Sequence, residues 1–104
     1  MNLKVPLNLN MVFNILLSKK ASIEIEESIE YYNGINKKLG KQFYVELLEN
    51  LSHIKNNPYL FQIKFDSFRE VPLKIFPFII VYEVLDNSII VNAVFHTSRN
   101  PENK

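Results

Sequence analysis

Apolar residues recur every three or four positions in two stretches of the chain, the spacing that places them on one face of a helix. The first helix is predicted to begin after Ser18, whose hydroxyl suits an N-cap, and to end at Asn33 and Gly34. The second is predicted to run from Lys37 to Asn56. Because the link between them is short, we expect an antiparallel helical hairpin. The core-facing positions are Ala21, Ile25, Ile29 and Tyr32 in the first helix and Leu39, Phe43, Leu47, Leu51 and Ile54 in the second.

After Pro58 the apolar residues alternate with polar ones, which is the period of a strand. Pro72 indicates a bulge or an edge position, and Asp86 with Asn87 indicates a two-residue hairpin connection. The predicted fold class is therefore α+β: an N-terminal strand, the antiparallel helical hairpin, and a twisted antiparallel sheet of about four strands with the hairpin on one face. The predicted strands are residues 13–17, 61–65, 71–75, 78–85 and 88–97.

The composition is that of an ordinary globular domain. The chain has 104 residues, of which 47% are apolar and 22% charged, and its net charge is +1. A domain so nearly neutral lacks the basic footprint of a nucleic-acid-binding protein. The absence of cysteine fits a reducing compartment, and no apolar run approaches the ~20 residues that cross a bilayer. We therefore expect a cytoplasmic protein without membrane association.

The chain is predicted to hold one domain. Residues 1–10 are interpreted as a peripheral N-terminal extension and residues 11–104 as the domain itself, with Met11 as an alternative start. An added edge strand is the competing interpretation of the extension, because its apolar residues alternate. These alternating residues are Leu3, Val5, Leu7 and Leu9.

Few residues in the sequence have side chains suited to catalysis or ligand binding. No metal-binding, phosphate-binding or nucleophile motif is present, and the glutamates are interpreted as solvated helix faces, so neither a cofactor nor a metal is predicted. His96 could act as a general acid or base, since imidazole titrates close to neutral pH, and Arg99 could bind a phosphate through two hydrogen bonds. The structural alternative has His96 bonding its strand neighbours and Arg99 in a surface ion pair. The polar residues expected near the end of the sheet are Lys64, Arg69, Lys74, Tyr82, His96, Thr97, Ser98 and Arg99.

Three segments resemble the toxins of the RelE/ParE superfamily of bacterial toxin–antitoxin pairs. They are the pattern YY-x(6)-LG-x(2)-F beginning at Tyr31, the pattern FPF-x(3)-Y beginning at Phe76, and the closing AVFHTSRNP. The resemblance extends from about Asn14 to Pro101 and leans toward the ParE-like, plasmid stabilisation branch. It implies a β-α-α-β-sheet fold, in agreement with the elements predicted above, and inhibition of growth unless a cognate antitoxin is bound.

Two mechanisms are implied by this resemblance. RelE-like members are ribosome-dependent mRNA endonucleases, which use several Lys and Arg side chains to orient the scissile phosphate and stabilise the transition state. ParE-like members are associated with poisoning DNA gyrase through protein contact. This chain has Val71, Pro72, Phe78 and Ile79 where nucleolytic relatives place basic residues. We therefore favour interference with gyrase and no enzymatic activity, with the mRNA endonuclease as the alternative and a degenerate, non-toxic antitoxin-binding module as a third interpretation.

The implied partners are a cognate antitoxin and DNA gyrase, or the ribosome with mRNA in the alternative; whether the chain dimerises is left open. Residues 78–85 and 88–95 are apolar on both faces, so the sheet face away from the hairpin is expected to present an apolar patch that an antitoxin would cover. In the endonuclease alternative, His96 and Arg99 are the catalytic residues. The candidates for contact with the target or a phosphate are Arg69, Lys74, Tyr82, Thr97, Ser98 and Arg99.

Overall fold

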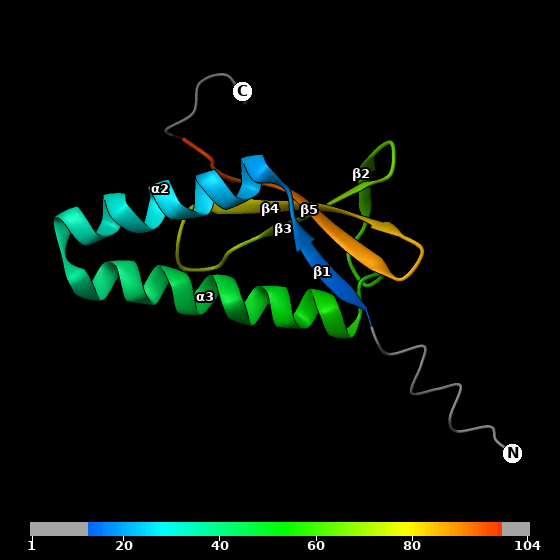
Figure 1. Cartoon of the computed structure of the whole chain (residues 1–104), viewed down its shortest axis with the longest axis horizontal. Coiled ribbons are helices and arrows are strands. Elements are labelled where there is room, and N and C mark those ends of the chain that lie inside the picture. The colour runs from blue at the N-terminus through cyan, green and yellow to red at the C-terminus, as the bar shows by residue number, and fades with distance from the viewer. Residues whose placement is uncertain (1–12, 99–104) are drawn as a thin grey trace, which may run out of the picture.

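A helical hairpin packs on one face of a single sheet in the computed structural model, which describes residues 13–98 (Figure 1). The five strands lie in the order β1-β5-β4-β3-β2. This arrangement confirms the predicted α+β fold class. The extension at residues 1–10, with its alternative interpretation as a strand, and Arg99 lie outside the described residues. The elements are β1 (Asn14–Leu17), α2 (Lys19–Ile35), α3 (Lys37–Asn56), β2 (Ile63–Phe65), β3 (Phe68–Pro72), β4 (Phe78–Leu85) and β5 (Ser88–His96).

The strands β2 to β5 form the predicted antiparallel sheet of four strands, and the N-terminal strand makes the whole sheet mixed. The strand β1 lies at one edge and runs parallel to β5, with Asn14 opposite Ser88 and Leu17 opposite Val91. The backbone N–H of Ser18 continues this pairing by donating to the C=O of Val91 at 2.9 Å. A strand of four residues is too short for its apolar pattern to reveal its partner, so the sequence alone did not place β1 in the sheet.

Among the other strands, β4 has the predicted bounds and β5 ends at His96. The hairpin between them is confirmed, with Asp86 at a φ of 56°. The strand β2 covers only the last part of the predicted 61–65, and β3 covers Phe68–Pro72 in place of the predicted 71–75. The shift of β3 has a specific cause in the β3–β4 loop, described below.

Asn36 separates the two helices. The predicted end of α2 at Asn33 and Gly34 is wrong, because the helix continues through both residues with no positive φ at the glycine. The backbone N–H of Asn36 donates to the C=O of Tyr32 at 2.9 Å and ends α2. Its side-chain Oδ1 accepts the N–H of Lys38 at 2.8 Å and caps the start of α3, which has its predicted bounds. One residue therefore closes one helix and opens the next.

The core between the hairpin and the sheet contains four packed aromatic rings. Tyr32 of α2 and Phe43 of α3 meet Phe76 of the β3–β4 loop and Phe78 of β4, with ring centroids 4.9 Å apart for Tyr32 and Phe76 and 4.7 Å apart for Phe43 and Phe78. Such pairs contribute about 0.5–1.5 kcal/mol each beyond the area they bury. The helices approach closely beside this cluster, since a Cβ on Gly40 would lie 1.9 Å from Oδ1 of Asn33. The aromatic cluster therefore fixes the hairpin over the start of β4.

A bulge in β5 is joined to the start of α2. The register between β4 and β5 shifts so that Asn92 is the extra residue. Its C=O accepts a hydrogen bond from Oγ of Ser18 at 3.0 Å, and the same Oγ accepts the N–H of Ala21 at 3.0 Å. Ser18 is thus the predicted N-cap and also satisfies a carbonyl that the bulge removes from the ladder.

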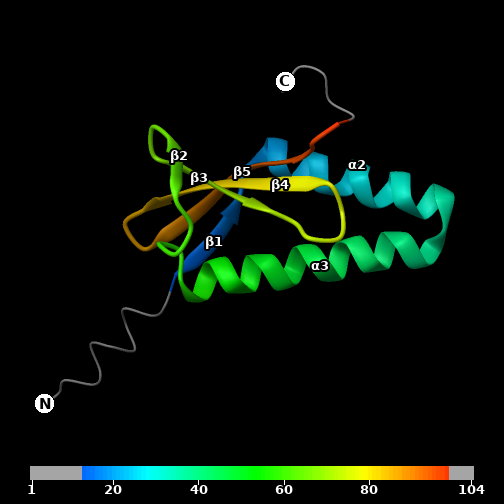
Figure 2. The ribbon, with the colours of Figure 1, turned by 180° about the vertical axis from the view of Figure 1, so that it is seen from behind.

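A buried carboxylate holds the β3–β4 loop. Glu46 of α3 is 6% exposed and accepts three consecutive backbone N–H groups, those of Lys74 and Ile75 at 2.8 Å and that of Phe76 at 3.1 Å. Because these amides point at the carboxylate, they are not available to a strand ladder, and β3 ends at Pro72. Figures 1 and 2 show the loop lying between the two helices. The interpretation of the glutamates as solvated is wrong for Glu46.

Replacing Glu46 should destabilise the domain more than any neighbouring acidic substitution. Hydrogen bonds to a charged group contribute about 1.5–3 kcal/mol each, so we expect Glu46→Ala to lower the free energy of unfolding by about 3 kcal/mol or more. Glu46→Gln should lose about half as much, since the amide retains one acceptor oxygen. Chemical denaturation measures both, with Glu49→Gln on the exposed surface of α3 as the matched control. Equal midpoints for Glu46→Ala and Glu49→Gln would contradict this role.

Candidate functional site

The polar candidates separate into two groups. Arg69 and Tyr82 face each other across β3 and β4 in the middle of the sheet. The second group lies where β5 ends beside the β3–β4 loop, and Tyr82 is four residues along β4 from this end, about 13 Å at the rise of a strand. Lys64 is exposed on β2 and belongs to neither group. We call the second group the loop end; it comprises Lys74, Ile75, His96, Thr97 and Ser98.

Tyr82 and Arg69 attach the segment before β2 to the sheet. Tyr82 is fully buried, and its hydroxyl donates to the C=O of Pro58 at 2.6 Å. Burial raises the pKa of the Tyr82 phenol, and the positive charge of Arg69 offsets part of this rise. The guanidinium of Arg69 donates to the C=O of Phe61 and lies 5.3 Å from the ring centre of Tyr59, a cation–π contact. Both side chains thus make structural contacts in the isolated chain.

His96 is held by its neighbours at the loop end. Its ring lies edge-on to Phe78, with centroids 5.1 Å apart and planes at 80°. Its Nδ1 accepts the backbone N–H of Ser98 at 3.0 Å, which assigns the proton of the neutral imidazole to Nε2. A general base must offer a lone pair to its substrate, and the Nδ1 lone pair is already engaged. This geometry suits a hydrogen-bond donor better than a proton acceptor.

The end of β5 is joined to the β3–β4 loop. Thr97 donates its backbone N–H to the C=O of Pro77 at 2.9 Å and its Oγ1 to the same oxygen at 3.3 Å. The loop carries Lys74, which is exposed, and Ile75, which is 78% exposed. Ile75 and Val45 of α3 line a shallow recess of about 440 Å³. The loop end therefore presents a cation and an apolar tip on the backbone that Glu46 binds, beside the hydroxyl groups of Thr97 and Ser98.

The described residues do not assemble the cation set of a nuclease around His96. Of the candidate cations, Lys74 lies at the loop end, Arg69 makes its contacts in the middle of the sheet, and Arg99 lies outside residues 13–98. Within those residues, no three histidine or acidic side chains gather to hold a metal ion. In the same part of the chain, no helix has the length and apolar character to span a membrane.

The face of the sheet away from the hairpin carries apolar side chains, as predicted, but these are at most half-exposed and share the face with Glu70 and Glu83. Ile79 and Phe95 pair across β4 and β5 on this face, and both are partly buried. Ile90 is also partly buried, and Val81 is 8% exposed. The strands thus carry apolar side chains on both faces, with the larger buried set toward the helices.

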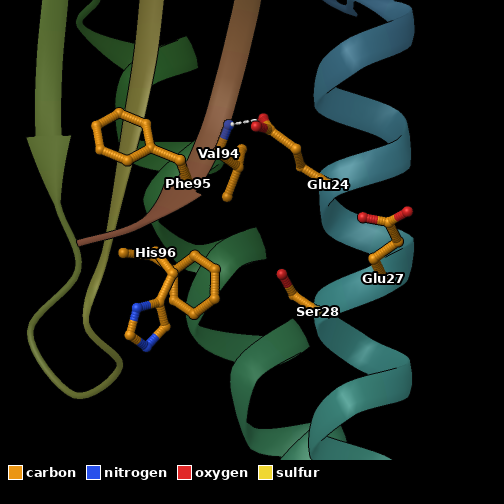
Figure 3. Close-up of a pocket in the computed structure, with 7 residues that line it drawn as sticks. Glu24, Glu27, Ser28, Val94, Phe95 and His96 are labelled. Atoms are coloured by element: carbon orange, nitrogen blue, oxygen red, sulfur yellow. Dashed lines mark hydrogen bonds between the residues drawn. The ribbon is translucent and has the colours of Figure 1, made fainter. Parts of the chain in front are cut away.

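A second helix carboxylate contacts the sheet near the loop end. Glu24 of α2 accepts the backbone N–H of Val94 at 2.8 Å (Figure 3). Its other oxygen lies 2.6 Å from Nζ of Lys20, one turn earlier in the helix. Like Glu46, Glu24 thus departs from the interpretation of the glutamates as solvated.

A helical hairpin on one face of a small sheet, with polar residues closing the last strand, is the architecture expected of the RelE/ParE toxins. The family model described as the ParE toxin of the type II toxin–antitoxin system parDE matches residues 15–101. The chain therefore belongs to this family of ParE toxins. A solved structure titled as the chromosomal ParDE toxin–antitoxin system from P. aeruginosa has a similar fold, with a TM-score of 0.73. It is 12% identical, and the match covers 83% of this chain and 97% of that one. No curated protein sequence matches the chain.

The roles of two residues that shape the loop end, Glu46 and Ile75, were not predicted from the sequence. Glu46 lies three positions after Phe43 and next to Leu47, so it falls on the core-facing side of α3. A glutamate at such a position has to find hydrogen-bond donors, and this was the available signal. Ile75 gave no signal, because its place in a period-two pattern made it resemble a buried strand residue.

Removing the Tyr82 hydroxyl should lower the free energy of unfolding at neutral pH. The variant should then lose less stability at alkaline pH than the wild type. Tyr82→Phe leaves the C=O of Pro58 without this donor, and we expect a loss of about 1–2 kcal/mol at neutral pH. The raised pKa of the folded state stabilises the protein fully below pH ~10, the ordinary phenol value, and this contribution is lost as pH rises through the folded pKa. Wild-type stability should therefore fall more steeply above pH ~10 than that of Tyr82→Phe.

Urea titrations between neutral pH and strongly alkaline pH test this. Tyr44→Phe, at an exposed tyrosine on α3, is the matched control and should follow the wild type at every pH. Parallel pH curves for wild type and Tyr82→Phe would contradict the assignment.

Proposed function

We propose that this chain is the toxin of a type II toxin–antitoxin pair, that it inhibits growth by contact with DNA gyrase in the cytoplasm, and that a cognate antitoxin neutralises it. Membership of the ParE family supports the first part. The observation that carries the second is Ile75, an apolar side chain 78% exposed at the tip of a loop whose amides Glu46 binds. A large apolar residue in this position is suited to insertion into a partner's pocket.

A β3–β4 loop whose backbone is already ordered favours inhibition through protein–protein contact. Binding through a flexible loop loses conformational freedom on association, at about 0.5–1.5 kcal/mol for each side chain that is immobilised, with the ordering of the backbone in addition. The three hydrogen bonds to Glu46 order the backbone of Lys74 and Ile75 before any partner arrives. Lys74 places a positive charge beside the apolar tip. We therefore assign target contact to Lys74, Ile75, Thr97, Ser98 and Arg99, and a structural role to Arg69 and Tyr82.

Catalysis by the same residues is less well supported. Cleavage of RNA requires preorganised donors around the scissile phosphate, and loss of one such donor commonly lowers the rate ~10²–10³-fold. Val71 and Phe78 are buried apolar residues at two of the positions where nucleolytic relatives place basic ones. The lone pair of His96 Nδ1 is bonded within the chain. The mRNA endonuclease thus has less support than gyrase poisoning.

The purified toxin should inhibit supercoiling by gyrase and leave mRNA on ribosomes uncut. We expect Ile75→Asp to raise the concentration needed for half-inhibition at least ~10-fold, because burying a carboxylate at an apolar contact is unfavourable. Leu60→Asp, at a leucine that is 65% exposed outside the loop end, is the matched control and should inhibit like the wild type. Gel assays of plasmid supercoiling measure the inhibition.

Primer extension on ribosomes programmed with a defined codon is run beside this assay. Codon-dependent cleavage that His96→Ala or Arg99→Ala abolishes would replace gyrase poisoning with the endonuclease. Absence of both activities, together with normal growth on induction of the toxin alone, would support the degenerate antitoxin-binding module.

The antitoxin should stabilise the toxin strongly. A ligand that binds only the folded state at a concentration 1,000-fold above its Kd adds about 4 kcal/mol. For a domain of this size, that corresponds to a rise in the melting temperature of about 15 °C or more. Thermal unfolding with and without the protein encoded beside this chain measures the rise. Separate elution of the two proteins in size-exclusion chromatography at micromolar concentration would contradict the pairing.

A further inference from the structure

A recess of about 230 Å³ lies between α2 and the last part of β5. Figure 3 shows Glu24 and Ser28 extending from the helix toward the strand that carries Val94 and His96, with Glu27 on the near side of the helix. This recess is separate from the exposed tip of the β3–β4 loop but shares His96 with the loop end. Its lining combines acidic groups with an apolar floor.

Ser28 is a buried hydroxyl aimed into this recess. It is 7% exposed, and its oxygen points from α2 toward β5 (Figure 3). No hydrogen bond joins this hydroxyl to another described residue. Buried hydroxyl groups in folded proteins are nearly always hydrogen-bonded, so an unused one facing a recess indicates a site for a polar ligand group.

The acidic side chains around the recess favour binding of a cation. Glu24 is already compensated, because one oxygen binds the N–H of Val94 and the other lies 2.6 Å from Nζ of Lys20. Glu27 is exposed at the rim, and no ion pair joins it to another described residue. A carboxylate at the rim of a recess that also holds a buried hydroxyl repels anions and favours an ammonium or guanidinium group, which has several N–H donors.

The adjoining strand edge fits an extended partner segment. The strand β1 pairs with β5 only from Ser88 to Val91, so in the described part of the chain no strand pairs with this edge of β5 from Asn92 to His96. Two backbone groups on this side already bind side chains: the C=O of Asn92 accepts Oγ of Ser18, and the N–H of Val94 donates to Glu24. A strand edge that no other described strand covers, beside a side-chain recess, is an arrangement by which folded domains bind extended peptides.

We propose that this recess binds a lysine or arginine side chain of the cognate antitoxin, carried on an extended segment that lies along the β5 edge. The inference rests on the proposed function and specifies how neutralisation would occur. The cationic group donates to Oγ of Ser28 and to the carboxylate of Glu27. A segment placed there also covers His96 and passes next to Thr97, so it obstructs the loop end that contacts the target.

Titration calorimetry with the full-length antitoxin tests the recess. Glu27→Lys should weaken binding at least ~10-fold, since it places like charges together. Ser28→Ala, which removes the hydroxyl without adding charge, should weaken binding ~3–10-fold. Glu26→Lys makes the same charge change at the adjacent exposed position of α2, outside the recess lining, and should bind within ~2-fold of the wild type. Circular dichroism verifies that each variant is folded.

The antitoxin side of the contact is tested by replacing its basic residues one at a time with alanine. One replacement should weaken binding to wild-type toxin and cause little further loss with Glu27→Lys, as expected for residues in contact. If Glu27→Lys, Ser28→Ala and Glu26→Lys bound the antitoxin with equal affinity, the proposed role of the recess would be overturned. The proposals of gyrase inhibition and of neutralisation would be unaffected. If Arg99→Ala in the toxin abolished the effect of Glu27→Lys, the recess would hold the chain's own cation and the proposal would also be overturned.

An antitoxin that does not bind the wild-type toxin would overturn this inference together with neutralisation. The supercoiling assay would still test the action on gyrase independently, because it uses the toxin alone.

Discussion

The hydrogen bonds from the Glu46 carboxylate to three consecutive backbone amides determine where the sheet ends and what it presents. Without them, the amides of Lys74, Ile75 and Phe76 would be free to extend the ladder, as the alternating sequence suggests. With them, the chain leaves β3 after Pro72, inserts Phe76 between the helices and displays Ile75 to solvent. A helix side chain thus sets the conformation of the loop end. The interaction is local, yet the aromatic core and the exposed tip both depend on it.

Glu24 accepts a backbone N–H of β5, as Glu46 accepts those of the β3–β4 loop. Its bond to the N–H of Val94 satisfies a backbone donor at the place where β1 no longer pairs with β5. Each helix of the hairpin therefore supplies one carboxylate to backbone amides near the end of the sheet. The two acids have different consequences for partners: Glu46 is buried and unavailable, while Glu24 lies in the wall of an acidic recess whose rim is Glu27. The proposed contacts with the target and with the antitoxin would then use adjacent surfaces that meet at His96.

Periodicity, together with the residue types at caps and turns, predicted the fold class, the bounds of α3 and β4, the Ser18 N-cap and the Asp86 hairpin. These features depend on local propensities and on burial of one helix face, which the order of residues records directly. The parallel pairing of β1 and the early end of β3 depend on contacts between residues far apart in the chain. For the same reason, the sequence could place His96, Thr97 and Ser98 together at a strand end but could not show that Tyr82 is buried against Pro58. The structure thus corrects the sequence where a polar side chain competes with the backbone ladder.

Amide hydrogen exchange, followed residue by residue by NMR, tests most directly whether Glu46 holds the loop before any partner binds. In the wild-type toxin, the amides of Lys74, Ile75 and Phe76 should be protected from exchange despite lying in a loop. Glu46→Gln should accelerate exchange of these three amides at least ~10-fold, while Glu49→Gln leaves them unchanged. Rapid exchange of all three amides in the wild type, at the rate of an unstructured segment, would contradict the claim that the carboxylate orders this end of the sheet.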